Sequence, residues 1–183
     1  MLSLLPVVFA GMCAMIDPPT SSGSRITPAA AAAAYKMLEA PDRRVRAPES
    51  RLRALLEEGF HRSPTFAALL TAINDSDVIV YIETTMLLPK DTRGRITIVP
   101  LPGKHERYLR IQIRYDLPRR EAISLLGHEM RHALEIAAET GVRDSAGLIK
   151  LYERIGHSSG GDHTYDTTAA QDAGRQVLSE LVG

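Results

Sequence analysis

Apolar residues recur at spacings of three and four in two neighbouring segments, which is the pattern of one buried helix face. In the first segment the apolar positions are Leu52, Leu55, Leu56 and Phe60, and in the second they are Phe66, Leu69, Leu70 and Ile73. Ser63 and Pro64 separate the two, and this pair is typical of a helix start. We therefore expect two amphipathic helices, the first beginning near Glu49.

Three later segments have the composition of β-strands. Residues 77–83, 95–99 and 107–115 are rich in Val, Ile or Tyr, and Gly94 and Pro102-Gly103 mark the breaks between them. In the last segment, polar and apolar residues alternate, as expected when one sheet face meets the core and the other meets water. These segments predict a small, mainly antiparallel three-stranded sheet.

The remaining periodic segments predict three more helices. Residues 118–139 carry apolar side chains at helical spacing, with Pro118 suited to a first turn and Gly141 to a stop. Residues 145–155 and 166–181 follow with the same kind of periodicity. The order of elements predicts an α+β domain that spans residues 49–183.

The N-terminal 48 residues have a different composition. Residues 1–16 carry no charged side chain and are mostly apolar, which resembles a secretory signal or an N-terminal tether, although Pro6 interrupts the run and no basic residue precedes it. Residues 17–48 are rich in Pro, Ser, Ala and Arg, as in a poorly ordered linker. We expect an exported or tethered protein with no firm membrane span. The alternative is a cytoplasmic protein with a disordered N-terminus.

The charge balance and the cysteine content exclude several classes of protein. The 183 residues include 22 Lys and Arg and 22 Asp and Glu, so no global field would draw the chain to nucleic acid. Cys13 is the single cysteine, which excludes an internal disulfide and a cysteine-based zinc finger.

A short motif in the predicted helix 118–139 points to metal chemistry. Residues 128–132 read His-Glu-Met-Arg-His. An α-helix turns about 100° per residue, so His128 and His132 project from one face about 6 Å apart and can reach one zinc ion. Glu129 lies beside that face, where it suits a general base for a zinc-bound water. The alternative is a helix whose two histidines face solvent or fill a polar seam.

With strands before this helix and a helix after it, the chain resembles the zincin metallopeptidases, in particular the gluzincin branch. The resemblance is carried by residues 127–134, Gly-His-Glu-Met-Arg-His-Ala-Leu. It implies a zincin-like fold in which the strand at 108–114 edges a cleft and holds the substrate backbone. Arg131 departs from the family, which keeps this position uncharged. Residues 133–136 and 166–170 also resemble short bacterial proteins of unassigned activity.

A catalytic zinc site normally takes three protein ligands, so a third ligand has to lie elsewhere in the chain. Asp166 shares the apolar stripe of the last predicted helix, where a buried carboxylate is costly without a partner. The alternative role for Asp166 is to cap that helix. The resemblance to gluzincins offers Glu153 instead, but Glu153 lies on the polar stripe of its own helix. We prefer Asp166 to Glu153 or His163.

Several other residues are candidates for supporting roles. Glu135 lies about 10 Å along the helix axis from His128, too far to join the ion but suited to hold an imidazole N–H. His157 and His163 flank a Ser-Ser-Gly-Gly segment and could stabilise an oxyanion or replace Asp166, and Tyr165 or Tyr152 could take the first role.

Together these features predict a zinc-dependent hydrolase, most simply a metallopeptidase acting on a peptide or protein. His128, His132 and Asp166 would bind Zn²⁺ and Glu129 would activate its water. The rival hypothesis is a zinc-stabilised binding module, or an inactive zincin relative that has lost hydrolysis. A third is a scaffold without metal.

Overall fold

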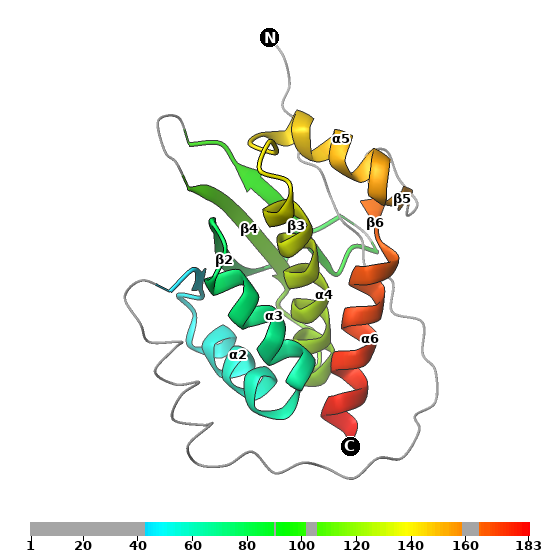
Figure 1. Ribbon diagram of the computed structural model, residues 1–183. Coiled ribbons are helices and arrows are strands. Elements are labelled where there is room, and N and C mark those ends of the chain that lie inside the picture. Colours follow the sequence, from blue (N-terminus) through cyan, green and yellow to red (C-terminus); the bar gives the residue numbers. More distant parts are fainter. Residues whose placement is uncertain (1–42, 90, 102–105, 159–164) are drawn as a thin grey trace.

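The computed structural model describes residues 43–89, 91–101, 106–158 and 165–183, which form five helices and two sheets (Figure 1). The helices are α2 (Ser50–Arg62), α3 (Pro64–Asn74), α4 (Arg119–Ala138), α5 (Ser145–Ile155) and α6 (Thr168–Val182). The strands are β1 (Val45–Arg46), β2 (Val78–Thr85), β3 (Gly94–Val99), β4 (Arg107–Arg114), β5 (His157–Ser158) and β6 (Tyr165–Asp166). The α+β class and the five predicted helices are thereby confirmed. The predicted signal at 1–16, most of the predicted linker at 17–48, and His163 lie outside the described residues.

The main sheet differs from the predicted one in size and direction. It has four strands in the order β1-β2-β4-β3, in which β1, β2 and β4 are parallel and only β3 is antiparallel. The prediction of a mainly antiparallel three-stranded sheet was therefore wrong. Strand periodicity marks where a strand lies but not its partner. Here β4 lies between β2 and β3, which follow each other in the chain. The added strand β1 falls within the stretch expected to be linker.

The strand order also shows that the prediction of residues 108–114 as the edge of a substrate cleft was wrong. Residues 107–114 form β4, which is paired on both sides, so its backbone cannot hold a substrate strand. In the described part of the chain, β3 pairs with β4 alone and forms that edge of the sheet.

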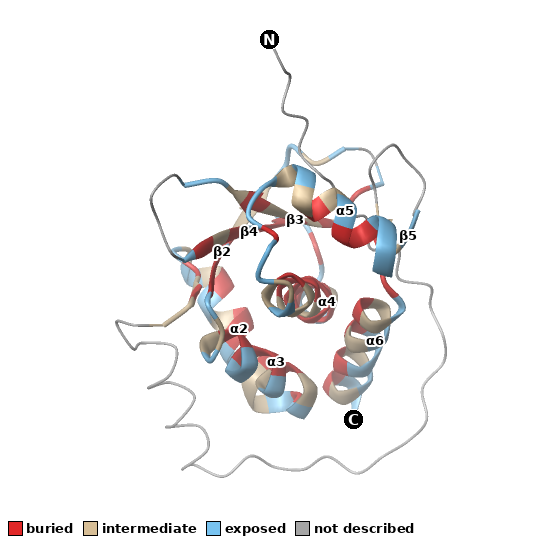
Figure 2. Ribbon diagram, turned by 45° about the horizontal axis from the view of Figure 1, so that its top comes forward, coloured by how far each residue is buried: buried red, intermediate tan, exposed pale blue. Residues whose placement is uncertain are grey.

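Helix α4 lies at the centre of the molecule. Viewed nearly along its axis, it has the sheet on one side and α2, α3 and α6 around the rest (Figure 2). Twelve of its 20 residues are buried, among them His128, Glu129 and His132. A close approach to α6 depends on Gly127, because a Cβ atom there would lie 2.9 Å from Cγ2 of Val177. The motif is thus held inside the fold, where each of its polar groups needs a partner.

Arg107 anchors the C-terminal end of α4. Its side chain is 1% exposed, and Nη1 donates to the carbonyls of Ile136 and Glu139 at 2.7 and 2.8 Å. Nη2 donates to the carbonyl of Ala137 at 2.9 Å and to Asp77 Oδ1 at 2.6 Å. The guanidinium satisfies carbonyls that a helix end leaves without intrahelical donors.

We expect Arg107→Ala to lower the free energy of unfolding by about 3 kcal/mol, because it leaves buried carbonyls and the Asp77 carboxylate without their donor. Urea denaturation of the variant measures the loss. Arg110→Ala is the matched control on the same strand, because the Arg110 side chain is 47% exposed, and it should change stability by less than about 1 kcal/mol. Equal stability of the two variants would contradict the anchoring role.

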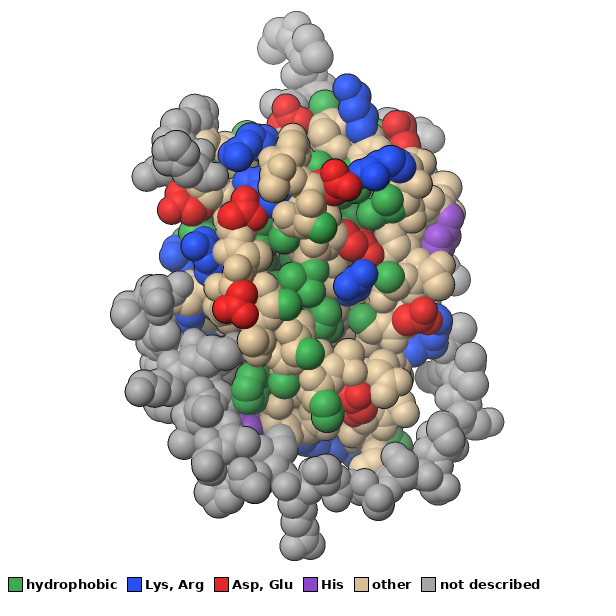
Figure 3. Space-filling view, viewed as in Figure 1, with side chains coloured by type: hydrophobic (Ala, Val, Ile, Leu, Met, Phe, Trp, Pro, Cys, Tyr) green, Lys and Arg blue, Asp and Glu red, His purple; other side chains and the backbone are tan. Residues whose placement is uncertain are grey.

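The surface seen in Figure 3 carries Lys and Arg interspersed with Asp and Glu, without a large field of one sign. Among the described residues, no helix is both long and apolar enough to cross a bilayer.

Candidate metal centre

Two imidazoles and one carboxylate converge between α4 and the start of α6. His128 and His132 lie one turn apart on α4, and their Nε2 atoms are 3.2 Å apart. Oδ1 of Asp166 lies 3.5 Å from each of these nitrogens. The three side chains are 7%, 0% and 2% exposed. A buried triangle of one carboxylate oxygen and two nitrogens results.

The size of this triangle fits a metal ion. Ligands about 2.0 to 2.1 Å from a tetrahedral ion lie about 3.3 to 3.4 Å from each other. The three separations in the cluster bracket that value, so His128, His132 and Asp166 could hold one ion.

Asp166 reaches the cluster because it precedes the last helix. The helix expected over 166–181 begins at Thr168, and Asp166 belongs to β6, which pairs with β5 through His157. The N-cap is Thr167, whose hydroxyl accepts from the backbone N–H of Ala170 at 3.1 Å. The alternative of Asp166 as the helix cap was therefore wrong. Thr is also among the residues that cap helices, and here it takes the position one residue after Asp166.

Each ligand has further contacts that orient it. The Nδ1 atom of His132 lies 2.9 Å from Glu135 Oε2, and the imidazole of His128 hydrogen-bonds the backbone of Ala170. Glu135 was predicted to make this kind of contact, but Thr167 and Gln171, which hold Asp166, were not predicted. The backbone N–H of Thr167 donates to Oδ1 at 2.7 Å, and Gln171 Nε2 donates to Oδ2 at 3.0 Å. Thr167 carries the sequence signal of a helix cap, which could have identified it.

Glu129 is fully buried beside the cluster. Among the described residues neither carboxylate oxygen has a hydrogen-bond partner, and burial raises the pKa of Glu129 to about 8. Gly94, at the start of β3, lies close to the Glu129 side chain, because a Cβ atom at Gly94 would lie 2.9 Å from Oε1 of Glu129. A buried carboxyl group without partners is costly, so this position suits a group that meets a ligand, a water molecule or a substrate.

The two imidazoles differ in their affinity for protons. Burial, together with the neighbouring His132, lowers the pKa of His128 to about 4. Burial alone would lower the pKa of His132, but hydrogen bonds to Asp166 and Glu135 raise it to about 9. In the metal-free protein His132 therefore binds a proton in preference to His128 at neutral pH.

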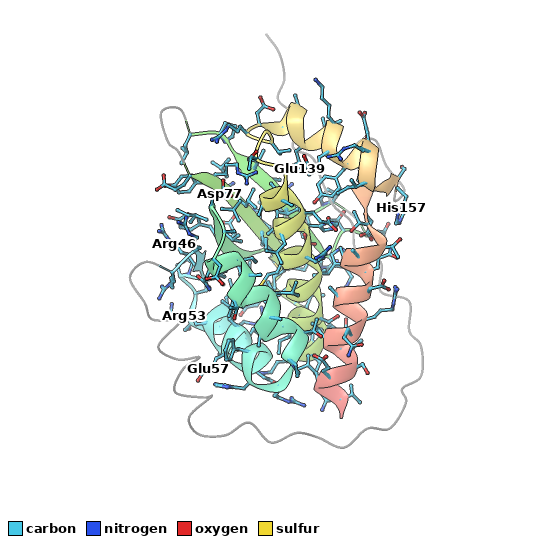
Figure 4. The ribbon with its side chains drawn as sticks, in the orientation of Figure 1. Arg46, Arg53, Glu57, Asp77, Glu139 and His157 are labelled. Carbon is cyan, nitrogen blue, oxygen red and sulfur yellow. The ribbon has the colours of Figure 1, made fainter. Side chains whose placement is uncertain are left out.

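The other candidates lie outside the cluster. Glu153 is exposed on α5, and His157 is exposed at the outer edge of the molecule (Figure 4), where its Nε2 lies 3.4 Å from Gln171 Nε2. Tyr165 is half-buried and packs against the core. The Arg131 side chain is 42% exposed, and its Nε lies 3.7 Å from Glu135 Oε1, so its nearest charged partner is Glu135.

No family model, curated protein or solved structure matches this chain.

Proposed function

We propose that the protein is a metal-dependent hydrolase, most simply a zinc peptidase with a zincin-like fold. The single observation that carries the proposal is the buried triangle of His128, His132 and Asp166 beside the carboxyl group of Glu129, which has no hydrogen-bond partner among the described residues. Two neutral imidazoles and one carboxylate are a ligand set that zinc favours, and three protein ligands leave one position open.

Each residue has a separate task in this proposal. His128, His132 and Asp166 would hold the ion, which supplies Lewis acidity and lowers the pKa of water at that position. Glu129 would take up the proton that the attacking water loses, because neither of its oxygens has a hydrogen-bond partner in the part of the chain that the structure describes. The raised pKa of Glu129 lies near neutrality, which lets the same group return the proton to the leaving group.

The sheet edge supports a polypeptide as the substrate. Strand β3 begins at Gly94, next to Glu129, and in the described residues it pairs on one side only. An extended peptide can add to such an edge through backbone hydrogen bonds. Gly94 would then bring the peptide backbone close to the carboxyl group that serves as base.

The burial of the cluster favours a second candidate, a zinc-stabilised module without hydrolytic activity. Structural zinc sites are closed, whereas catalytic sites keep a position open to solvent or substrate. His132 and Glu129 are both 0% exposed in this structure. On this second hypothesis Glu129 would serve packing alone, and the protein would bind zinc and cut nothing.

Digestion of a broad peptide library by the zinc-loaded full chain tests the proposal. We expect about one zinc per chain and peptide cleavage that stops with a chelator and returns with added zinc. Zinc at the same stoichiometry with no cleavage would support the binding module instead. Cleavage that survives removal of the metal would contradict both.

A further inference from the structure

The carboxylate of Glu135 lies at the meeting point of three helices. Oε2 lies 2.9 Å from His132 Nδ1 on α4, and the Tyr152 hydroxyl on α5 donates to Oε2 at 3.3 Å. Oε1 accepts from the Thr167 hydroxyl at the start of α6, at 2.8 Å. Burial would raise the pKa of Glu135, but the hydrogen bonds from His132 and Thr167 keep it below its usual value. Glu135 is therefore an anionic acceptor for all three donors.

Thr167 joins this acceptor to the carboxylate of the triangle. Its hydroxyl has one proton, which goes to Glu135, while the hydroxyl oxygen accepts from the Ala170 N–H. Its backbone N–H donates to Oδ1 of Asp166, the oxygen that faces both histidines. A continuous path of hydrogen bonds therefore runs from His132 through Glu135 and Thr167 to Asp166.

Tyr152 fixes the same imidazole from another side. Its hydroxyl lies 3.2 Å from His132 Nδ1 and 3.3 Å from the His132 carbonyl, and the side chain is fully buried. Burial raises the pKa of Tyr152 well above its usual value, so the hydroxyl stays a neutral donor. With Nδ1 held by Glu135 and Tyr152, Nε2 faces His128 and Asp166, and its lone pair becomes available to an ion once the ring has lost its second proton.

We propose that Glu135, Tyr152 and Thr167 are positioning residues that hold His132 and Asp166 in the geometry a metal ion requires. We call these three residues the bracket. This inference rests on the metal site proposed above and extends it. Partners of this kind change metal affinity or activity by about 10- to 100-fold when removed. The bracket draws its parts from three helices, so it ties the packing of α5 and α6 against α4 to the geometry of the site.

Zinc affinity of the full chain, measured by competition with a chromogenic chelator, tests the bracket without reference to hydrolysis. Thr167→Val removes the hydroxyl and keeps the shape of the side chain, and we expect zinc to bind about 10- to 100-fold more weakly. Thr167→Ser restores the hydroxyl and should restore most of the affinity. Tyr152→Phe should also weaken binding, and the visible absorption of bound Co²⁺ should change in both weakened variants.

Thr65 offers a matched control for loss of stability. Its hydroxyl donates to Glu180 Oε1 at 2.8 Å, the same length as the contact between Thr167 and Glu135, in a place apart from the metal cluster. Thr65→Val should leave zinc affinity and the Co²⁺ spectrum unchanged. A double-mutant cycle separates the effects further, because Thr167→Val and Glu135→Gln should be less than additive in zinc affinity.

The outcomes separate this inference from the proposed function. A parent chain that binds no zinc would overturn the metal site itself. Zinc bound by Thr167→Val as tightly as by the parent chain would overturn the bracket and leave the site standing. Equal weakening by Thr65→Val would also overturn it, because the effect would then come from general destabilisation.

Discussion

Glu129→Gln should abolish hydrolysis while zinc stays bound. The amide keeps the shape of the side chain but cannot accept the proton from water, so we expect turnover to fall by about 10²- to 10⁴-fold. The ligands of the ion are untouched, so zinc stoichiometry should remain at one per chain. Peptide cleavage and metal content, measured on the same preparation, check both parts.

Glu129→Gln should also raise the free energy of unfolding at pH 8, because the carboxyl group that it replaces is buried. The pKa of Glu129 in the folded chain is raised above its unfolded value, so the stability it contributes is present below about pH 4.5 and is lost as pH rises through about 8. Glutamine cannot ionise, so metal-free Glu129→Gln should be the more stable protein at pH 8. Glu139→Gln is the control, because the Glu139 side chain at the C-cap of α4 is 44% exposed, and this variant should leave cleavage unchanged. Retained turnover in Glu129→Gln would contradict the assigned role.

Zinc affinity should rise steeply with pH. Because the pKa of His132 is raised to about 9, an incoming ion must displace a proton at any pH below that value. The apparent dissociation constant should therefore fall about tenfold per pH unit, or about 100-fold between pH 6 and pH 8. His128 has a pKa lowered to about 4 and is neutral throughout this range, so it adds no dependence of its own.

Calorimetry in buffers with different ionisation enthalpies measures the protons released. At least one proton should leave per zinc bound at pH 7, and a second would leave if Glu129 ionises when the ion enters. A zinc affinity that does not change between pH 6 and pH 8 would contradict a site built on His132.

The helices and the motif could be predicted from sequence because their signals are local. Leu52, Leu55 and Leu56 mark a buried helix face within a few residues, and His128 and His132 share a helix face because of the helix repeat alone. The sheet could not be predicted in the same way. Strand β4 lies between two strands that precede it, and its pairing with β2 depends on contacts about 30 residues apart in the chain.

In the candidate site, too, residues with a local sequence signal could be predicted, and residues whose role depends on packing could not. Asp166 was found because a carboxylate on an apolar stripe needs a partner, although the capping role belongs to its neighbour. Thr167 was missed as a support because its backbone N–H and its hydroxyl act on two different residues, Asp166 and Glu135. Such a double role depends on how α6 packs against α4, which no local pattern in the sequence records. Arg107 was placed in a strand by its neighbours, and nothing near it in sequence indicates that it anchors α4.

Anomalous diffraction at the zinc absorption edge, on crystals of the full chain grown with zinc, tests the central claim most directly. We expect one strong peak within about 2.0 to 2.2 Å of Nε2 of His128, Nε2 of His132 and Oδ1 of Asp166. A zinc peak elsewhere, or none at these three atoms in zinc-loaded crystals, would contradict the metal centre and the chemistry proposed for it.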